Sequence, residues 1–458
     1  MSKLVVISNR VMSPNFKKKE SSGGLIVAID KALKKSGGIW IGWSGDVKPE
    51  NHEKHYEIKD ENVNYITLDL TKNNYENFYN GYCNDILWPL FHYRLDLINY
   101  SKDRYLSYKK VNILFAEKVV SFLSKDDLIW VHDYHFMLLA KELRKRKCTQ
   151  KLGFFLHVPW PSREVLMVLP DHYELVSGLL DYDIIGFQTK NYALAFLDYI
   201  IRELNGNVEP DGFVYALGKR TRVQHFPISI ETDEFSKLSS KAKNSNHIQR
   251  LVKSLGEEKL IVGVDRLDYS KGLIKRFQAY EHLLKNYPAN IKKTTFLQIS
   301  PTSRGDVSKY KQLRRDLETK AGHINGTFAD FDWTPIRYLN KGFSRQILSG
   351  FFRRSQIGLV TPLRDGMNLV AKEYVASQSH ENPGVLILSI FAGSAEELDG
   401  AILVNPYDID EMANAIDIGL KMNLDERISR WSGMIDRLQS HDIDYWAKQC
   451  IQAIRKVF

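Results

Sequence analysis

The chain has 458 residues, of which 43% are hydrophobic and 26% charged, and it contains 28 glycines and 14 prolines. This composition is typical of a globular protein of about two domains, and it excludes collagen-like, fibrous and disordered classes. Lys and Arg number 64 against 55 Asp and Glu, so the net charge of +9 suits nucleic acid, an anionic membrane or small phosphorylated molecules.

The cysteine content and the hydropathy pattern indicate where the protein works. Only three cysteines are present, without CxxC spacing, which excludes a disulfide framework and a Cys-rich zinc site. The N-terminal apolar run is too short for a signal peptide, and no run of about 18 apolar residues occurs. We therefore expect a cytoplasmic protein that neither enters nor crosses a membrane.

Short runs of Val, Ile, Leu and Phe alternate with segments of helical period, which predicts an α/β fold with parallel sheets covered by helices. Helices are expected between the strands, for example at 108–123 and 191–204. The predicted strands of the first half are 4–8, 65–70, 128–132, 152–157, 183–187 and 223–230.

A polar stretch at 237–246 reads as a linker between two domains. The alternation restarts after it and predicts a second doubly wound domain, followed by an amphipathic C-terminal helix that crosses back toward the first domain. Ligands bind at the carboxyl ends of strands in such sheets, so a cleft between the two domains is expected. The predicted strands of the second half are 260–264, 295–299, 356–360, 385–389 and 402–404.

Several motifs of the first half follow predicted strands. Ser21-Ser-Gly-Gly-Leu25 would let backbone amides approach a phosphate or sugar at a helix N-terminus, although a tight turn explains it equally. Trp130-Val-His-Asp-Tyr-His135 and His157-Val-Pro-Trp-Pro161 place polar groups where a ligand would lie, or serve as structural hydrogen-bonding groups. The aromatic residues Trp43, Tyr79 and Trp88 suit either a sugar site or the core.

Two cations mark the first loop of the second domain. Arg266 and Lys271 lie on the turn after the strand at 260–264, where a helix begins. Two cations at a helix N-terminus are favourable only beside an anion. We interpret them as a grip for a diphosphate, with an ion pair between Arg266 and Asp268 as the structural alternative.

The segment 361–373 follows the strand at 356–360 and is the strongest ligand candidate. Its amides at 366–369 would face a sugar or a phosphate, Asp365 would accept sugar hydroxyls, and Glu373 would reach a ribose diol. Arg304, in the loop after 295–299, fits a phosphate or a surface salt bridge equally well. There is no GxGxxG, Walker or HExxH motif, so simple dehydrogenases, Walker ATPases and a catalytic metal lose support.

Taken in order over essentially the whole chain, these motifs resemble those of the trehalose-6-phosphate synthase family, the retaining glycosyltransferases of family 20. The residues that carry the resemblance are Ser8-Asn-Arg10, Ser22-Gly-Gly-Leu25, Trp40-Ile-Gly-Trp-Ser-Gly45, Leu87-Trp-Pro89, Trp130-Val-His-Asp-Tyr-His135, His157-Val-Pro-Trp-Pro161, Arg266-Leu-Asp-Tyr-Ser-Lys-Gly272, Pro301-Thr-Ser-Arg304 and Arg364-Asp-Gly-Met-Asn-Leu-Val-Ala-Lys-Glu373.

The resemblance implies a fold of two Rossmann-like domains facing a cleft, the GT-B type. Residues 1–238 would bind the acceptor glucose 6-phosphate, 247–440 would bind the nucleotide sugar, and the helix at 441–458 would pack across the boundary. The implied reaction transfers glucose from UDP-glucose to glucose 6-phosphate with retention, giving α,α-trehalose 6-phosphate and UDP.

The resemblance also implies roles for individual residues. Catalysis would involve His157, Arg266, Lys271 and Asp133. The acceptor and its phosphate would be held by Arg10, Tyr79, Trp88, Asp133 and Arg304, and Trp88 with Val158 would select its anomer. The donor would be bound by Gly23, Gly24, His157, Arg266, Lys271, Phe343 (at the uracil), Asp365, Gly366, Met367, Asn368, Leu369, Val370, Ala371, Lys372 and Glu373.

The remaining expectations concern cofactors and partners. The family's proposed front-face mechanism needs neither a metal nor another cofactor, and no nucleic-acid or membrane partner is implied. A homodimer or homotetramer is expected. The one DxDx[TV] match, at 330–334, lies inside the second domain and is interpreted as chance, so a separate trehalose-6-phosphate phosphatase would act on the product.

Three alternatives stay open. One is the sister activity that makes glucosylglycerol phosphate from ADP-glucose and glycerol 3-phosphate, against which Tyr79 and Trp88 favour a hexose phosphate. Another is a non-catalytic regulatory subunit of a trehalose-synthesising complex, although Arg266, Lys271 and Glu373 are all present. The third is a nucleic-acid-binding protein, for which no clustered basic and aromatic face is apparent.

Overall fold

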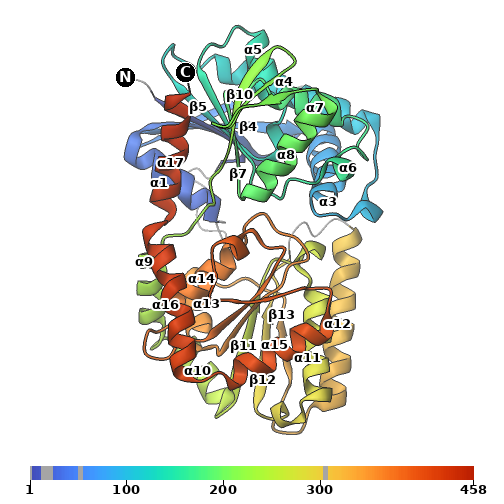
Figure 1. Ribbon diagram of the computed structural model, residues 1–458, viewed down its shortest axis with the longest axis vertical. Helices are drawn as coiled ribbons and strands as arrows, with labels where there is room; N and C mark the ends of the chain where they lie inside the picture. The colour runs from blue at the N-terminus through green and yellow to red at the C-terminus, as the bar shows by residue number, and fades with distance from the viewer. Residues whose placement is uncertain (1–2, 12–23, 50–54, 303–307, 458) are drawn as a thin grey trace. The chain divides into compact units, whose positions relative to one another are not determined.

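The computed structural model describes residues 3–11, 24–49, 55–302 and 308–457. The chain divides into two compact units: unit 1 comprises Met1–Ile228 and Asp444–Phe458, and unit 2 comprises Ser229–Ile443 (Figure 1). Each unit is built around its own β-sheet with helices packed on it. The predicted α/β class with two parallel-sheet domains is therefore confirmed.

Unit 1 contains a ten-stranded sheet in the order β3-β4-β2-β1-β5-β6-β7-β10-β9-β8. The pairs from β4 to β10 are parallel, whereas β3, β9 and β8 pair antiparallel at the two edges. The strands are β1 (Leu4–Arg10), β2 (Gly38–Lys48), β3 (His55–Asp60), β4 (Val63–Thr71), β5 (Leu128–His132), β6 (Lys151–Phe155), β7 (Ile184–Phe187), β8 (Asn207–Val208), β9 (Phe213–Ala216) and β10 (Lys219–His225).

The helices of unit 1 are mostly short, and one is a π-helix, η1 (Tyr75–Leu87). The longest is α4 (Lys102–Val120), which packs against η1 and α5. The others are α1 (Gly24–Ser36), α2 (Lys72–Asn74), α3 (Trp88–Phe91), η2 (Leu95–Leu97), η3 (Tyr134–Phe136), α5 (Leu139–Lys145), α6 (Arg163–Leu166), α7 (His172–Leu179), α8 (Lys190–Glu203) and α17 (Ile443–Lys456).

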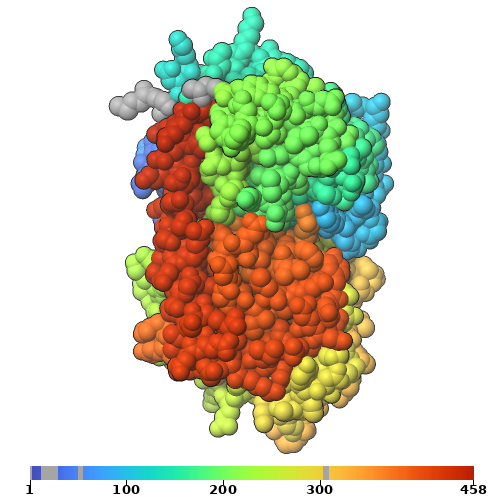
Figure 2. Space-filling model, in the orientation of Figure 1, coloured from blue at the N-terminus to red at the C-terminus, as the bar shows by residue number. Residues whose placement is uncertain are grey.

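The C-terminal helix α17 packs on the sheet of unit 1 through one apolar stripe. Trp446, Cys450 and Ile454 recur every four residues and are all buried. The stripe fits because β6 carries Gly153, where a Cβ would lie only 2.4 Å from Ile454 Cδ1. Figure 2 shows α17, in red, on the outer surface of unit 1 beside segments coloured green.

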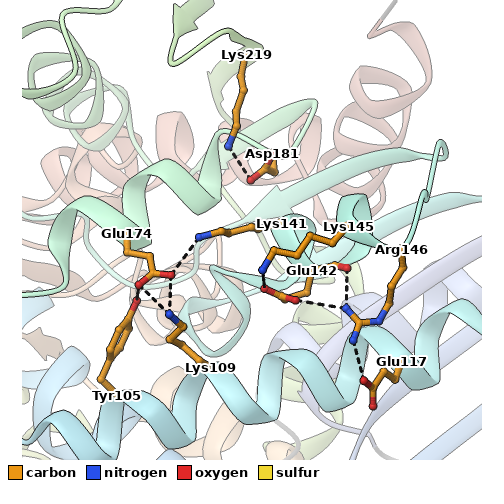
Figure 3. Close-up of polar contacts among 10 residues, drawn as sticks. All are labelled: Tyr105, Lys109, Glu117, Lys141, Glu142, Lys145, Arg146, Glu174, Asp181 and Lys219. Atoms are coloured by element: carbon orange, nitrogen blue, oxygen red, sulfur yellow. Dashed lines mark hydrogen bonds and ion pairs between the residues drawn. The ribbon is translucent and has the colours of Figure 1, made fainter.

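A polar network on unit 1 ties α4, α5 and α7 together around Glu174 (Figure 3). The carboxylate accepts hydrogen bonds from Tyr105 at 2.6 Å, Lys109 at 2.8 Å and Lys141 at 3.1 Å. Burial by itself would raise the pKa of Glu174, but these hydrogen bonds lower it to about 2. Glu174 is therefore charged at neutral pH.

Unit 2 contains a six-stranded, fully parallel sheet in the order β13-β12-β11-β14-β15-β16. Successive side chains alternate between two cores: Leu260 and Val262 face one, whereas Ile261 faces the other. The strands are β11 (Lys259–Val264), β12 (Thr294–Ile299), β13 (Ile336–Leu339), β14 (Ile357–Val360), β15 (Val385–Ser389) and β16 (Ile402–Val404).

Helices cover both faces of this sheet, since one core takes side chains from α9, α10, α13, α14 and α16 and the other from α11, α12 and α15. They are α9 (Thr232–Ala242), α10 (Asn246–Leu255), η4 (Tyr269–Lys271), α11 (Leu273–Asn286), η5 (Pro288–Asn290), α12 (Ser308–Phe328), α13 (Arg345–Arg354), α14 (Leu369–Ser377), η6 (Gly393–Glu396), α15 (Ile409–Lys421) and α16 (Leu424–Ser440).

The expected linker at 237–246 is largely helical and belongs to unit 2, as do residues 229–238, which the sequence analysis assigns to the first domain. The reason is that α9 buries a stripe of mostly small residues. Phe235, Ser239 and Ala242 share its inner face, so a sequence low in large apolar residues still packs. The compact units change over after Ile228 and again after Ile443.

Candidate active site

In unit 1, a cation and aromatic rings gather where β1 and β2 end. The pairing of these strands slips after Ile7, which places Arg10 opposite Trp43. The Arg10 guanidinium carbon lies 4.5 Å from the centre of the Trp43 ring, a cation–π contact. The Trp43 ring is in turn 5.1 Å from that of Tyr79. Because Arg10 is exposed, this group offers a positive charge above an aromatic wall.

The π-helix η1 positions Tyr79 and leads directly to Trp88. Tyr79 stacks on Tyr75 at 5.7 Å and on His135 at 6.2 Å. At the end of η1, the Trp88 amide donates to the carbonyl of Cys83, five residues back, and α3 then begins at Trp88. π-Helical turns are rare and occur frequently at functional sites. The sequence pattern did not indicate this one.

Asp133 follows β5 in a conformation that few non-glycine residues adopt, with a φ of 74°. Its amide donates to the carbonyl of Phe155 at 2.8 Å, and its Oδ1 accepts from the amide of His157 at 3.3 Å. The backbone strain is thus held by neighbours on β6 and just beyond it. Strain of this kind clusters at functional sites, which agrees with the role expected for Asp133.

A chain of hydrogen bonds fixes the ring of His157. Gln188 accepts from the Ile228 amide through Oε1 at 3.0 Å, so its Nε2 is the group that faces His157 Nδ1 at 3.4 Å. His157 Nδ1 is then an acceptor, and Nε2–H donates to His132 Nδ1 at 3.1 Å. This direction assigns the Nε2–H tautomer to His157.

Both histidines of this pair are held in the neutral form. Burial lowers the pKa of His157 to about 3. It lowers the pKa of His132 far below its usual range, and the neighbouring His157 lowers it further. His132 has no exposed surface, and the ring of Trp446 on α17 lies 6.1 Å from that of His157. His157 is thus suited to hydrogen bonding rather than to carrying charge at neutral pH.

Val158, the other residue expected to act on the acceptor anomer, follows directly and is buried. Trp88 is also buried, and only 6% of its surface is exposed. Its ring lies 4.2 Å from that of His92 and 6.1 Å from that of Tyr134. Trp88 therefore belongs to the packed wall of unit 1 rather than to its open surface.

In unit 2, the loops after β11 and β14 bring a cation and a carboxylate together. Lys271 Nζ lies 2.5 Å from Asp365 Oδ2, which also accepts from Asn368 Nδ2 at 3.0 Å. Leu363 N donates to the carbonyl of Ser270 at 2.8 Å and ties one loop to the other. Arg266 lies on the same loop as Lys271 and is exposed. Both predicted cations are thus on one loop, and Lys271 contacts Asp365.

The side chain of Asp268 caps the turn that carries Lys271. Its Oδ1 accepts from both the amide and the hydroxyl of Ser270 at 3.0 Å. Gly272 ends this turn in the left-handed region, with a φ of 67°, and begins α11. The turn therefore sets where Lys271 points.

Helix α14 begins at the second loop, so the N–H groups of its first turn point toward that loop. Asn368 is its N-cap, in a left-handed conformation, and its side chain accepts from the amide of Ala371 at 3.3 Å. Met367 is buried, and its carbonyl accepts from Ser394 N at 2.8 Å. Gly366 is buried, whereas Leu369 and Val370 are partly exposed. A helix N-terminus with this geometry favours an anion.

The last two residues of the motif point in different directions. Lys372 has no exposed surface and pairs with Glu397 at 2.5 Å, so its side chain forms an internal ion pair. Glu373 is partly exposed, and burial raises its pKa to about 7, partly offset by Arg345. Phe343 is half-buried against Phe351, with ring centres 5.4 Å apart.

Some predicted site residues have no described side chain. Gly23 and Arg304 lie outside the described residues, and Gly24 is described only as the first residue of α1. Among the described residues, no group of three or more His, Cys, Asp or Glu could hold a metal ion. The described helices also include none long and apolar enough to span a membrane.

The structure adds site-neighbouring residues that sequence reasoning missed, namely His132, Gln188 and Arg276. Arg276 shares the apolar face of α11 with Leu273, Phe277 and Tyr280, and a charge in such a face was the one available signal. His132 lies inside the Trp130–His135 motif without being singled out. Nothing in the sequence around Gln188 indicates its contact with His157.

Known proteins resemble this chain over its full length. The family model described as Glycosyltransferase family 20 matches residues 2–456. A trehalose-6-phosphate synthase of Cronobacter sakazakii is 47% identical over 457 residues, which cover 100% of this chain and 96% of that protein.

Solved structures agree in fold as well. An α,α-trehalose-phosphate synthase (UDP-forming) from Burkholderia xenovorans, in complex with glucose-6-phosphate, has a TM-score of 0.95 and 43% identity over 99% of this chain and 100% of its own. An E. coli protein bound with UDP-2-fluoro glucose has a TM-score of 0.95 and 45% identity over 100% of both chains. With a family model and relatives that span it from end to end, and with cationic loops at the carboxyl ends of two parallel sheets, this chain belongs to glycosyltransferase family 20.

Proposed function

We propose that the protein transfers glucose from UDP-glucose to the anomeric hydroxyl of glucose 6-phosphate, with retention, to give α,α-trehalose 6-phosphate and UDP. The observation that carries the proposal is the pair of loops in unit 2 that set Lys271 against Asp365 at the start of α14. A cation and free amides suit a diphosphate, and a carboxylate suits sugar hydroxyls. The relatives that bind these two substrate types support it.

The donor would be held by unit 2. Arg266 and Lys271 would bind the diphosphate, and the backbone from Asp365 to Leu369 would contact glucose and phosphate, continuing through Val370, Ala371 and Lys372. Glu373 would accept hydrogen bonds from the ribose hydroxyls, and Phe343 would lie at the uracil. The Lys271–Asp365 ion pair would break on donor binding, because Lys271 would then contact the diphosphate and Asp365 would accept a hydrogen bond from a glucose hydroxyl.

The acceptor would be held mainly by unit 1. Arg10, above the ring of Trp43, would bind its phosphate, and Arg304 of the chain segment that forms unit 2 would be the second cation. Tyr79 and Asp133 would contact the sugar, and Trp88 with Val158 would restrict its anomer. His157, fixed and neutral, would donate or accept a hydrogen bond at the transferred glucose, and Gly23 and Gly24 would lie near the donor phosphates.

The chemistry would depend mainly on charge stabilisation and positioning. The bond from the glucose anomeric carbon to the diphosphate oxygen breaks, and the new bond forms to the acceptor hydroxyl on the same face of the sugar. The departing phosphate oxygen takes the hydroxyl proton. Arg266 and Lys271 stabilise the negative charge that grows on UDP. We propose that no metal ion takes part in this reaction, and we expect EDTA to leave turnover unchanged.

A matrix of four substrate pairs tests the proposal. UDP-glucose or ADP-glucose is supplied with glucose 6-phosphate or glycerol 3-phosphate, and nucleotide release and the sugar phosphate formed are measured. Trehalose 6-phosphate from UDP-glucose is the expected result. Glucosylglycerol phosphate would replace the proposal by the sister activity, and no product from any pair would favour a regulatory subunit.

The proposal extends to the protein's surroundings. Cys83, Cys148 and Cys450 are buried and form no disulfide with one another, which suits the cytoplasm. We propose that the protein works there as a homodimer or homotetramer, and that a separate phosphatase converts its product to trehalose. Light scattering of the purified protein would measure its mass and test the oligomer.

A further inference from the structure

Arg276 of α11 is a charged residue with no exposed surface, and every arm of its guanidinium meets an acceptor. Nη1 donates to Asp265 Oδ2 at 2.7 Å and to Gln298 Oε1 at 3.2 Å. The other two arms reach the loops of the candidate donor site, because Nε donates to Thr361 Oγ1 at 3.1 Å and Nη2 to the carbonyl of Lys271 at 3.0 Å.

The acceptors of Arg276 come from separate segments of unit 2. Asp265 directly follows β11, Gln298 lies on β12 and Thr361 directly follows β14. The carbonyl of Lys271 belongs to the turn that ends at Gly272. One side chain therefore joins the ends of three strands to the turn that carries the predicted diphosphate cation.

The two loops also touch each other at the point that Arg276 supports. A Cβ at Gly272 would lie 2.4 Å from the carbonyl oxygen of Thr361, so only glycine fits there. Leu363 N closes the contact by donating to Ser270 O at 2.8 Å. A shift of either loop would therefore move Lys271 relative to Asp365.

We propose that Arg276 is a positioning residue for the donor: it does not touch UDP-glucose but holds the loops of Lys271 and Asp365 in the arrangement that binds the diphosphate. This inference rests on the proposed function, since it assigns a donor to these loops. An arginine is required because its planar fork can serve the ion pair with Asp265 and both loop contacts at once. A lysine would keep the charge and lose the fork.

The variant Arg276→Lys separates positioning from simple charge compensation. If Arg276 served only to neutralise Asp265, lysine would suffice, and donor binding would stay as in the wild type. Under the proposal, loss of the arms to Lys271 and Thr361 raises the Kd for UDP by about tenfold and lowers kcat by about 10- to 100-fold, because a loop displaced by about 1 Å costs this much. The KM for glucose 6-phosphate stays within about twofold.

A milder variant and a matched control accompany it. Thr361→Val removes the hydroxyl that accepts from Arg276 Nε, with little change in side-chain shape. We expect it to weaken UDP binding by about three- to tenfold, as the loss of one hydrogen bond does. Tyr280→Phe, on the same helix and equally buried, removes a hydrogen bond to Thr294 at 3.0 Å that does not reach the loops. It should lower stability without changing the Kd for UDP.

The measurements are titration calorimetry with UDP and steady-state kinetics for both substrates, on variants whose fold is checked by circular dichroism. Wild-type affinity for UDP in folded Arg276→Lys would overturn the proposal, and if that variant does not fold, wild-type affinity in Thr361→Val would overturn it. The wild type could bind UDP but transfer no glucose, while the variants bind UDP more weakly. That result would refute the proposed function and still support the role of Arg276. A wild-type protein that binds no UDP would refute both.

Discussion

Lys271 is one of the two cations that the proposed mechanism assigns to the departing diphosphate. It lies 2.5 Å from Asp365 and ends a turn capped by Asp268, so its direction is set before a donor arrives. An ammonium group held beside a leaving phosphate stabilises the transition state by about 3 to 4 kcal/mol, comparable to one oxyanion-hole donor. Because several other residues hold the turn in place, substituting Lys271 tests the role of its charge without moving the loop.

We predict that Lys271→Ala lowers kcat by about 10²- to 10³-fold, because the charge growing on UDP loses its partner. The fold should persist, since the side chain lies on the turn beyond the carboxyl end of β11 and Arg276 still holds that turn through the backbone of residue 271. Steady-state kinetics together with circular dichroism make the comparison. Near-normal turnover in a folded variant would contradict this role.

The buried pair His132 and His157 predicts how stability changes with pH. In the unfolded chain both would take a proton near pH 6.5, whereas in the folded chain both stay neutral. The unfolded state then binds these two protons below pH 6.5 and the folded state does not, so the contribution of the pair to the free energy of unfolding falls as the pH falls. From pH 7.5 to 5.5 the loss is about 1.4 kcal/mol for each histidine.

Urea unfolding at pH 7.5 and 5.5 measures this loss, and His132→Asn is the comparison variant. Asn keeps an acceptor near the position of Nδ1 but does not titrate, so the change in the free energy of unfolding between the two pH values should differ from that of the wild type by about 1.4 kcal/mol, the share of one histidine. Glu373, whose pKa burial raises to about 7, titrates in the same range with the opposite sign, but it does so in both proteins and cancels in the comparison. An unchanged pH dependence in the variant would contradict the assignment.

At the scale of helices and strands, burial decides what the sequence reveals. The central parallel strands are covered on both faces, so they read as continuous apolar runs such as Leu128–His132 and Val385–Ser389 and were predicted from the sequence. The edge strand β3 is largely exposed and polar, and β2 mixes glycine with tryptophan, so neither matched that pattern. The spacing of buried residues along the π-helix η1 is close to that of an α-helix, so the sequence pattern does not distinguish the two.

The same reasoning separates the predicted and the missed parts of the candidate site. Motif residues on the loops after β11 and β14 adjoin in sequence and could be named one by one. The contacts of Arg276 come together from distant segments, as do those of His157 with Gln188, and such contacts exist only in the folded chain. Likewise, the burial of the Lys372 side chain follows from Glu397, which lies 25 residues away.

The C-terminal helix α17 gives a test at this scale, because its packing depends on one glycine. Gly153→Ala would set a methyl group 2.4 Å from Ile454, and overpacking of this kind costs about 1 to 3 kcal/mol. Urea unfolding should show that loss, together with faster proteolysis within 444–457. Gly322→Ala is the control: it lies on the exposed side of α12 with no atom nearby, so it should leave stability unchanged or raise it slightly.

At the scale of the whole molecule, the proposed function divides substrate binding between the two units. Unit 1 offers a cation over aromatic rings, which suits a sugar phosphate, and a fixed neutral histidine, which suits the transferred glucose. Unit 2 offers cationic loops and helix amides, which suit a nucleotide sugar. The proposed transfer would need both sets of residues, so the identity of the product would report on both units at once.

The most direct test is NMR spectroscopy of the product formed by the purified protein from UDP-[1-¹³C]glucose and glucose 6-phosphate. The expected product is a single labelled disaccharide phosphate in which the labelled carbon is joined through oxygen to the anomeric carbon of glucose 6-phosphate, with both centres in the α configuration. A β configuration at the labelled carbon, a linkage to any other hydroxyl, or release of free labelled glucose alone would contradict it.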